Sequence, residues 1–404
     1  MKRRVVITGM GLVSSLGNTL DDFWKALISG KSGISKVSSL DTSAYPHHYG
    51  GEAREFNSRR ILSDAETKVY GRASQFSIVA AYDALVDSGL YEKLAELRKH
   101  IGVVMGTTFG EAHVVEEATR FLVQNNGTEG QNRLNLKQYP PHILSVNIAK
   151  KFGFCGPNLV IPTACAAGNY AVAYAASLIK TGKSEIMIAG GADPFSRVSF
   201  SGFSRLGVMA DDRCQPFDRN RKGMLVGEGA AIMILENYES ARSREVRIYG
   251  EILGYGLSCD ANHMTIPEVG GITSVMEKSV KNSGIGVKDV DYICAHGTGT
   301  MVNDKTESLA IRKVFYERGN QVPVSSIKSM LGHTMGAASA LEAIASVLAI
   351  NNNELPPTIN YETPDPECDI DCVPNKSRKK KTDVVLNNSF AFGGNNACVV
   401  LARA

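Results

Sequence analysis

The feature that most constrains the fold of this chain is the regular alternation of strand-like and helix-like segments along its length. Short apolar runs typical of buried strands alternate with longer stretches of helical period. This alternation predicts an α/β fold. The predicted strands are residues 5–8, 101–105, 158–162, 185–189, 231–236, 248–257, 292–295 and 383–386. The predicted helices are residues 73–88, 166–180, 271–282, 305–318 and 335–350.

No Pro- or Ser-rich linker interrupts the alternation, so the 404 residues form either two domains or one large α/β unit. The most favourable boundary follows the helical stretch 240–244. It gives an N-terminal half of residues 1–250 and a C-terminal half of residues 251–404, which we expect to be closely packed. The glycines that follow the first predicted strand, beginning with Gly9 and Gly11, are interpreted as its turn.

Composition excludes several classes of function. A formal net charge of +3 gives no reason to expect a nucleic-acid partner. No stretch approaches the ~20 apolar residues of a membrane span. The 8 cysteines form no disulfide-like framework, so we expect a cytoplasmic protein. Cys368 and Cys372 lack the second ligand pair of a structural zinc site, and no metal is expected.

One cysteine lies where a predicted strand gives way to a predicted helix. Cys165, in Thr163-Ala164-Cys165-Ala166, follows the strand 158–162 and falls at the N-terminus of the next helix. The helix dipole and free N–H groups there favour an anion, and thiolate is the reactive form of cysteine. The position therefore predicts a lowered thiol pKa and a nucleophile, with a small buried cysteine as the alternative.

Two of the 8 histidines have unusual surroundings. His296 follows the end of a predicted strand, where α/β folds place their chemistry. His333 precedes an alanine-rich helix whose positive dipole end disfavours imidazolium, so we expect a neutral hydrogen-bond donor. Each histidine alone is compatible with a structural role. Both together with Cys165 indicate a catalytic site.

Two charged residues complete this group. Glu342 lies on an otherwise apolar helical stretch after His333, and a buried carboxylate needs a partner. Lys328 is the predicted partner, in an ion pair that orients the site. A surface position for Glu342 is the alternative.

Four motifs in this order resemble the elongating β-ketoacyl-(acyl-carrier-protein) synthases, especially the synthase II type. They are Thr163-Ala164-Cys165-Ala166, His296-Gly297-Thr298-Gly299-Thr300, Lys328-x4-His333 and Asn388-Ser389-Phe390-Ala391-Phe392-Gly393-Gly394-Asn395. The resemblance spans nearly the whole chain. It implies a thiolase-like fold of two pseudo-equivalent βαβαβαββ halves, stacked as five layers (αβαβα) and usually dimeric.

The resemblance also implies a reaction without a bound cofactor. An acyl group moves from the phosphopantetheine arm of an acyl carrier protein to Cys165. Malonyl on a second carrier loses CO2, and His296 and His333 stabilise the resulting enolate, which attacks the Cys165 thioester. The backbone N–H groups of Cys165 and Phe392 would form the oxyanion hole, with Phe392 also serving as the acyl gate.

The same resemblance assigns supporting residues. Thr298 and Thr300 would lie near the phosphopantetheine arm. Asp304 and Glu307 would support the His296 loop, although a charge pair at a helix N-terminus explains them equally well. Because the carrier is typically acidic, a basic stretch is a predicted docking surface, with a solvated helix face as the alternative. It comprises Arg59, Arg60, Lys68 and Arg72.

Three departures from the family pattern concern the acyl substrate. Ala167-Gly168-Asn169 replaces more polar residues, and Ala391 stands between Phe390 and Phe392 where Gly is usual. The resemblance assigns Phe109 and Phe390 to the acyl pocket, and Phe109 is bulky for its place there. These changes make a specialised polyene or type II polyketide system a rival to fatty acid elongation.

Other functions fit less well. A thiolase would need a second catalytic cysteine, and Cys398 lies inside a predicted strand. A synthase III-type enzyme would have Asn in place of one histidine. A non-catalytic chain-length factor would lack Cys165. The chain could still be the catalytic half of a heterodimer with such a factor, instead of a homodimer.

Overall fold

The computed structural model describes residues 3–127 and 136–404. Its main sheet has the strand order β10-β9-β13-β14-β8-β1-β7-β6-β4-β5. The strands of this sheet are β1 Val5–Val13, β4 Ile101–Gly106, β5 Asn158–Ile161, β6 Ile186–Asp193, β7 Gly229–Asn237, β8 Gly250–Cys259, β9 Tyr292–Cys294, β10 Val324–Ser325, β13 Val384–Phe390 and β14 Asn395–Ala402. Two small ladders join β2 Ser35–Lys36 to β3 Tyr49–Gly50 and β11 Glu354–Leu355 to β12 Arg378–Lys379.

Each half of the main sheet repeats the order of the other half. From the outer edge inward the halves read β5-β4-β6-β7-β1 and β10-β9-β13-β14-β8. In both halves the first three strands are parallel and the last two are antiparallel to their neighbours. The pairs Val6–Glu251 and Ile7–Gly250 join β1 to β8. The predicted α/β fold of two equivalent halves is therefore confirmed.

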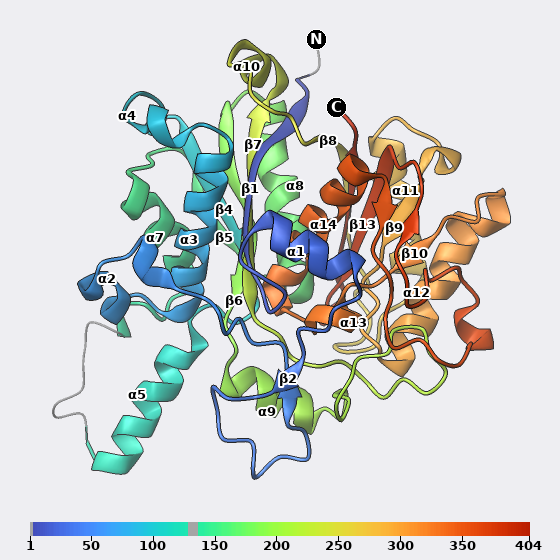
Figure 1. The fold of residues 1–404 in the computed structure, drawn as a ribbon, viewed down its shortest axis with the longest axis horizontal. Helices are drawn as coiled ribbons and strands as arrows, with labels where there is room; N and C mark the ends of the chain where they lie inside the picture. Colours follow the sequence, from blue (N-terminus) through green and yellow to red (C-terminus); the bar gives the residue numbers. More distant parts are fainter. Residues whose placement is uncertain (1–2, 128–135) are drawn as a thin grey trace.

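Helices cover both half-sheets and fill the space between them (Figure 1). One outer layer holds α3 and α7, the other holds α11 and α12, and α8 and α14 form the central layer. Three apolar cores match these contacts: one around the central helices and one beneath each outer layer. The six helices are α3 Arg72–Asp87, α7 Ile143–Phe152, α8 Ala167–Lys180, α11 Val269–Asn282, α12 Met301–Val314 and α14 Ala338–Asn352.

The remaining helices lie around this layered body. In Figure 1, α5 projects away from it. Within the described residues, no helix has the length and apolar character needed to cross a membrane. These helices are α1 Leu20–Ile28, α2 Asp64–Val69, α4 Leu94–Leu97, α5 Ala112–Asn125, α9 Arg197–Arg205, α10 Tyr238–Ser243 and α13 Lys328–Leu331.

The first strand is longer than predicted. Gly9 and Gly11 were expected to form a turn, but both lie inside β1. A Cβ atom on Gly9 would lie 2.3 Å from the carbonyl oxygen of Ala84, and one on Gly11 would lie 2.1 Å from that of Ala80. The glycines therefore let α3 rest directly on the strand, and that close approach is the reason for their presence.

Candidate active site

Cys165 lies at the junction of β5 and α8, as predicted. It belongs to a 3₁₀ turn, Ala164–Ala166, that leads into α8. Ala164 has a φ of 49°, an uncommon left-handed conformation for a residue with a Cβ. The hydroxyl of Ser389 donates to the Cys165 carbonyl oxygen over 2.9 Å. The turn is thus fixed from the strand β13 of the other half.

His296 follows β9 and begins the loop that leads into α12. The buried carboxylate of Glu307 accepts the backbone N–H groups of His296 and Gly297 over 2.9 and 2.8 Å. Asp304 accepts the N–H of Gly299 and, over 2.8 Å, that of Phe217. Both carboxylates are completely buried. They hold the loop by its backbone from α12, and Asp304 lies in the first turn of that helix.

His333 lies between α13 and a 3₁₀ turn, Met335–Ala337, that precedes α14. The backbone N–H of Met335 donates to Nδ1 of His333 over 3.1 Å. A neutral imidazole whose Nδ1 accepts a hydrogen bond carries its proton on Nε2. Nε2 of His333 is buried and has no partner among the described residues. His333 therefore offers an unused N–H donor to the site.

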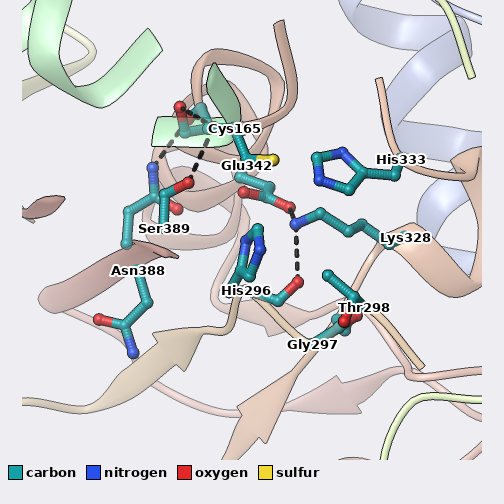
Figure 2. A network of polar contacts seen from close by, with 12 residues as sticks. Cys165, His296, Gly297, Thr298, Lys328, His333, Glu342, Asn388 and Ser389 are labelled. Carbon is teal, nitrogen blue, oxygen red and sulfur yellow. Dashed lines mark hydrogen bonds and ion pairs between the residues drawn. The ribbon is translucent and has the colours of Figure 1, made fainter. Parts of the chain in front are cut away.

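The three side chains meet in one place. The sulfur of Cys165, one ring nitrogen of His296 and one ring nitrogen of His333 all lie within 4.8 Å of one another. The two imidazole rings are edge to face, with centroids 5.5 Å apart. Figure 2 shows the sulfur atom and both rings facing a common space. Residues from the two halves of the chain therefore form a single site.

Lys328 and Glu342 form the predicted ion pair. Both are buried, with 1% of each residue exposed, and the ammonium of Lys328 contacts a carboxylate oxygen of Glu342. Lys328 Nζ also donates to the carbonyl oxygen of His296 over 2.7 Å (Figure 2). Burial raises the pKa of Glu342 to about 7, while Lys328 acts to lower it. The pair links α14 to the His296 loop.

The electrostatic setting of Cys165 differs from the prediction. Burial raises the pKa of its thiol to about 11, although the charge of Lys328 and the N–H groups of Phe392 and Cys165 lower it. The predicted lowering was wrong, because the cost of removing a thiolate from water outweighs the effect of the Lys328 charge and of the two N–H groups. Both N–H groups therefore favour negative charge at the sulfur.

The imidazoles are neutral for the same physical reason. Burial, followed by the positive charge of Lys328, lowers the pKa of His296 and of His333 well below the ordinary range. The neutral His333 was predicted from the helix dipole. The structure shows that burial and a nearby ammonium are the principal causes.

A thiol and two imidazoles also make a donor set that zinc accepts. The tautomer of His333 opposes such a site. With the Met335 N–H on Nδ1, Nε2 holds the ring proton and has no lone pair for a metal. The described geometry therefore favours donation of hydrogen bonds to a substrate oxygen.

A cavity of about 280 Å³ leads from Cys165 to the surface. Its lining includes Thr298 and Thr300, whose hydroxyls lie 2.9 Å apart, together with the predicted Phe390 and Phe392. Phe109 does not line it. The Phe109 ring instead packs edge-on against Phe203, with centroids 6.4 Å apart, and Phe203 faces the cavity.

The predicted docking residues lie outside this cavity. Arg59 pairs with Asp64 at 3.2 Å, and Arg60 donates to Asp83 over 2.7 Å. Lys68 lies on α2. Arg72 donates through Nε to the buried Glu228 over 2.8 Å. Arg72 therefore ties α3 to the body, while its side chain stays 39% exposed, much like the 40% of Arg60.

Two contacts of the site, made by Asp193 and Ser389, were not predicted from the sequence. Asp193 accepts the N–H groups of Thr108, Phe109 and Gly336, which connects the Phe109 loop to the turn after His333. Its place at the carboxyl end of an apolar strand was an available signal. The Ser389 hydroxyl beneath Cys165 offered none, because it depends on contact between the halves.

Family models and curated relatives match this chain over most of its length. The family model described as "Beta-ketoacyl synthase, N-terminal domain" matches residues 2–241, and "Beta-ketoacyl synthase, C-terminal domain" matches residues 249–362. The 3-oxoacyl-(acyl-carrier-protein) synthase 2 of Coxiella burnetii is 40% identical over 414 residues, covering 100% of this chain and 99% of the relative.

Solved structures give the same result. "The ishigamide ketosynthase/chain length factor" is similar with a TM-score of 0.96 and 40% identity, covering 100% of both chains. A type II polyketide synthase acyl-carrier protein in complex with its ketosynthase bound to the hexaketide is similar with a TM-score of 0.91 and 32% identity, again over 100% of both chains.

Proposed function

The chain belongs to the beta-ketoacyl synthase family, and from this premise we propose that it condenses a malonyl group with an acyl group held on Cys165, both delivered by an acyl carrier protein. It is an acyltransferase of the β-ketoacyl-(acyl-carrier-protein) synthase type. The observation that carries the assignment of roles is the meeting of one thiol and two neutral imidazoles within 4.8 Å.

In the first step the acyl group changes from one sulfur to another. The Cys165 sulfur attacks the carrier thioester, the carrier sulfur leaves, and it takes up the proton that the thiol gives up. The N–H groups of Cys165 and Phe392, which act on the sulfur, would stabilise the oxyanion of the tetrahedral intermediate. Because these donors favour charge near the sulfur, they offset part of the effect of burial.

In the second step the malonyl carboxylate leaves as CO2, and its electron pair forms an enolate. His333 would donate its Nε2–H to the enolate oxygen, and His296 would be the second donor. The enolate carbon then attacks the Cys165 thioester carbonyl, and the thiolate leaves. Neutral donors suit this step, because a hydrogen bond is needed on the oxygen without transfer of a proton.

The supporting residues act through the histidine loop. Lys328 holds the His296 carbonyl and keeps both imidazoles neutral, while Glu342 balances its charge. Asp304 and Glu307 fix the loop backbone. The hydroxyls of Thr298 and Thr300 face the cavity, where they would hydrogen-bond to the phosphopantetheine arm.

The gate loop determines access to the acyl side. Ala391 donates its N–H to Asn395 over 2.9 Å, and Gly393 and Gly394 have φ values of 86° and 78°. We propose that this turn moves Phe392 away from Phe203, its ring neighbour at 6.1 Å. Phe109, behind Phe203, would limit the depth of the acyl site indirectly.

Two pathways fit these features. Fatty acid elongation is supported by relatives named as 3-oxoacyl synthases. A specialised polyene or type II polyketide system, with this chain as the catalytic ketosynthase beside a chain-length factor, is supported by the similarity to the ishigamide ketosynthase/chain length factor. Efficient and unselective use of saturated acyl chains would argue for the first pathway.

Mass spectrometry of the intact protein tests both the chemistry and the preference. The protein is incubated with a panel of saturated and unsaturated acyl-carrier thioesters. We expect a mass increase equal to one acyl group on the wild type and on the control variant Cys155→Ser, whose cysteine is exposed. Cys165→Ala should show none. Chain lengthening by Cys165→Ala would refute the proposal.

We also propose a dimer formed along the free edge of β5, either with a second copy or with a chain-length factor. Within the described residues, β5 pairs with β4 alone. Apolar side chains near this edge are exposed, namely Leu159 at 38% and Val146 at 37%. An unpaired strand edge with apolar neighbours favours association.

Three further expectations stay predictions. The halves 1–250 and 251–404 would be domains that fold together, because they share the central core. Arg59, Arg60, Lys68 and Arg72 would contribute to carrier docking. All 8 cysteines are free thiols, which agrees with the expected reducing cytoplasm.

A further inference from the structure

Lys222 stands at the opening of the active-site cavity. Among the cavity-lining residues that the structure describes, it is the only Lys or Arg. Its side chain is 69% exposed. The ammonium therefore lies at the mouth of the cavity and not beside Cys165.

The backbone around Lys222 is attached to the loop that carries the two threonines. The preceding residue, Arg221, is buried and donates to the carbonyl oxygens of Thr300 and Met301 over 3.3 and 3.1 Å. On the other side, a Cβ atom on Gly299 would lie 2.8 Å from the Gly223 oxygen. Lys222 is thus held next to the proposed path of the phosphopantetheine arm.

The rest of the opening is largely apolar. Exposed Leu206, Met264, Ile266 and Met301 line it. His263 is also exposed there, and its Nδ1 accepts the N–H of Thr265 over 3.1 Å. With Nδ1 occupied as an acceptor, Nε2 is the ring nitrogen that carries an N–H. An anion at the opening finds the Lys222 ammonium and this N–H donor.

We propose that Lys222, assisted by His263, binds the phosphate of the phosphopantetheine arm. The inference rests on the proposed function, in which the thioester end of the arm reaches Cys165. The arm would then pass Thr298 and Thr300, and its phosphate, at the opposite end, would lie at the opening. A phosphate is a strong acceptor for an ammonium.

The present partner of Lys222 is easily replaced. Asp211 lies 3.0 Å from its ammonium, and the side chain of Asp211 is 62% exposed. Exposed ion pairs of this kind are weak. Replacing this carboxylate by a phosphate therefore costs little free energy.

Calorimetric titration with phosphopantetheine and with pantetheine, which lacks the phosphate, tests the proposal. The wild type should bind phosphopantetheine about three- to fivefold more tightly, the range expected for an exposed charge pair. Lys222→Gln should lose this preference and keep its affinity for pantetheine. Asp211→Asn should keep or increase the preference for phosphopantetheine over pantetheine. Lys379→Gln, at a remote lysine whose side chain is 84% exposed, is the control.

Persistence of the phosphate preference in Lys222→Gln would overturn the proposal. An effect of Lys222→Gln that is seen only with carrier-bound substrate would also overturn the proposal, because Lys222 would then contact an acidic side chain of the carrier. Binding is measured without turnover. A wild type that binds phosphopantetheine as expected but forms no condensation product would therefore count against the proposed function and not against this site.

Discussion

At the scale of single residues, the tautomer of His333 explains how a neutral side chain serves as a donor. The Met335 N–H occupies Nδ1, so the only ring proton is on Nε2. Burial, followed by the charge of Lys328, lowers the pKa of the ring and keeps it from taking a second proton. The backbone thus determines the chemistry that the side chain can perform.

Replacing His333 by Ala should therefore separate the two steps of the reaction. We expect condensation to fall about 10²- to 10³-fold, the usual effect of losing one donor to developing negative charge. Acylation of Cys165 should persist in this variant, as measured by mass spectrometry of the intact protein. His100→Ala, at an exposed position, is the control. Equal loss of both steps would contradict the assigned role.

Glu307 makes the stability of the protein depend on pH. Burial raises its pKa to about 7, although two N–H groups oppose this. Its unfolded pKa is about 4.3, so the folded state binds the proton more strongly. The stabilisation is complete below the unfolded value and is lost as pH rises towards the folded value.

The free energy of unfolding of the wild type should therefore decrease more between about pH 4.5 and 7 than that of Glu307→Gln. Denaturant unfolding at several pH values within this range measures the difference. The two proteins are compared directly, so titration of groups that do not interact with Glu307 cancels, and Glu342, whose pKa Glu307 raises, adds to the difference. Parallel pH profiles would show that Glu307 does not titrate in this way.

At the scale of elements, the starts of α8 and α14 are equivalent in the two halves. Each follows a short 3₁₀ turn that opens with a left-handed residue, Ala164 with a φ of 49° and Met335 with a φ of 54°. The two helices pack together in the central layer. This arrangement brings the nucleophile and His333 to the same end of the layer.

The close approach of these helices requires Gly168. A Cβ atom there would lie 2.7 Å from the Ser339 hydroxyl oxygen and 2.8 Å from the Ala340 nitrogen. Gly168→Ala should destabilise the protein by about 1–3 kcal/mol and lower activity, as measured by denaturant unfolding and condensation assays. Gly202→Ala is the matched control. Gly202 lies in α9, and no atom of a neighbouring element lies within 4 Å of a Cβ added there. Comparable stability of the two variants would contradict this account.

At the scale of the whole molecule, the edge of β5 is the place where the proposed dimer should form. Leu159→Lys should shift the protein towards the monomer, because a buried lysine at an apolar interface is costly. Size-exclusion chromatography with light scattering measures the change. Leu257→Lys, at a comparable exposure of 36% on β8, should leave the oligomeric state unchanged. A dimer that survives Leu159→Lys would place the interface elsewhere.

Sequence alone predicted five of the six helices that form the three helical layers, and the residues that meet in the site. The α/β alternation, the positions of Cys165, His296 and His333, and the Lys328–Glu342 pair all agree with the structure. These depend on residue type and on periodicity within one segment, both of which are local properties. The length of β1, the start of α12 at Met301 and the tie made by Arg72 were not predicted.

Only the tertiary structure determined which side chains support the reacting groups and how far these groups are buried. The amides of Asn169 and Asn387 bond over 2.9 Å although they are 218 positions apart, and Phe109 lies behind Phe203. The thiol pKa rose because the folded halves exclude water from Cys165. Burial and contacts between distant segments arise only when the halves close on each other, so no local pattern encodes them.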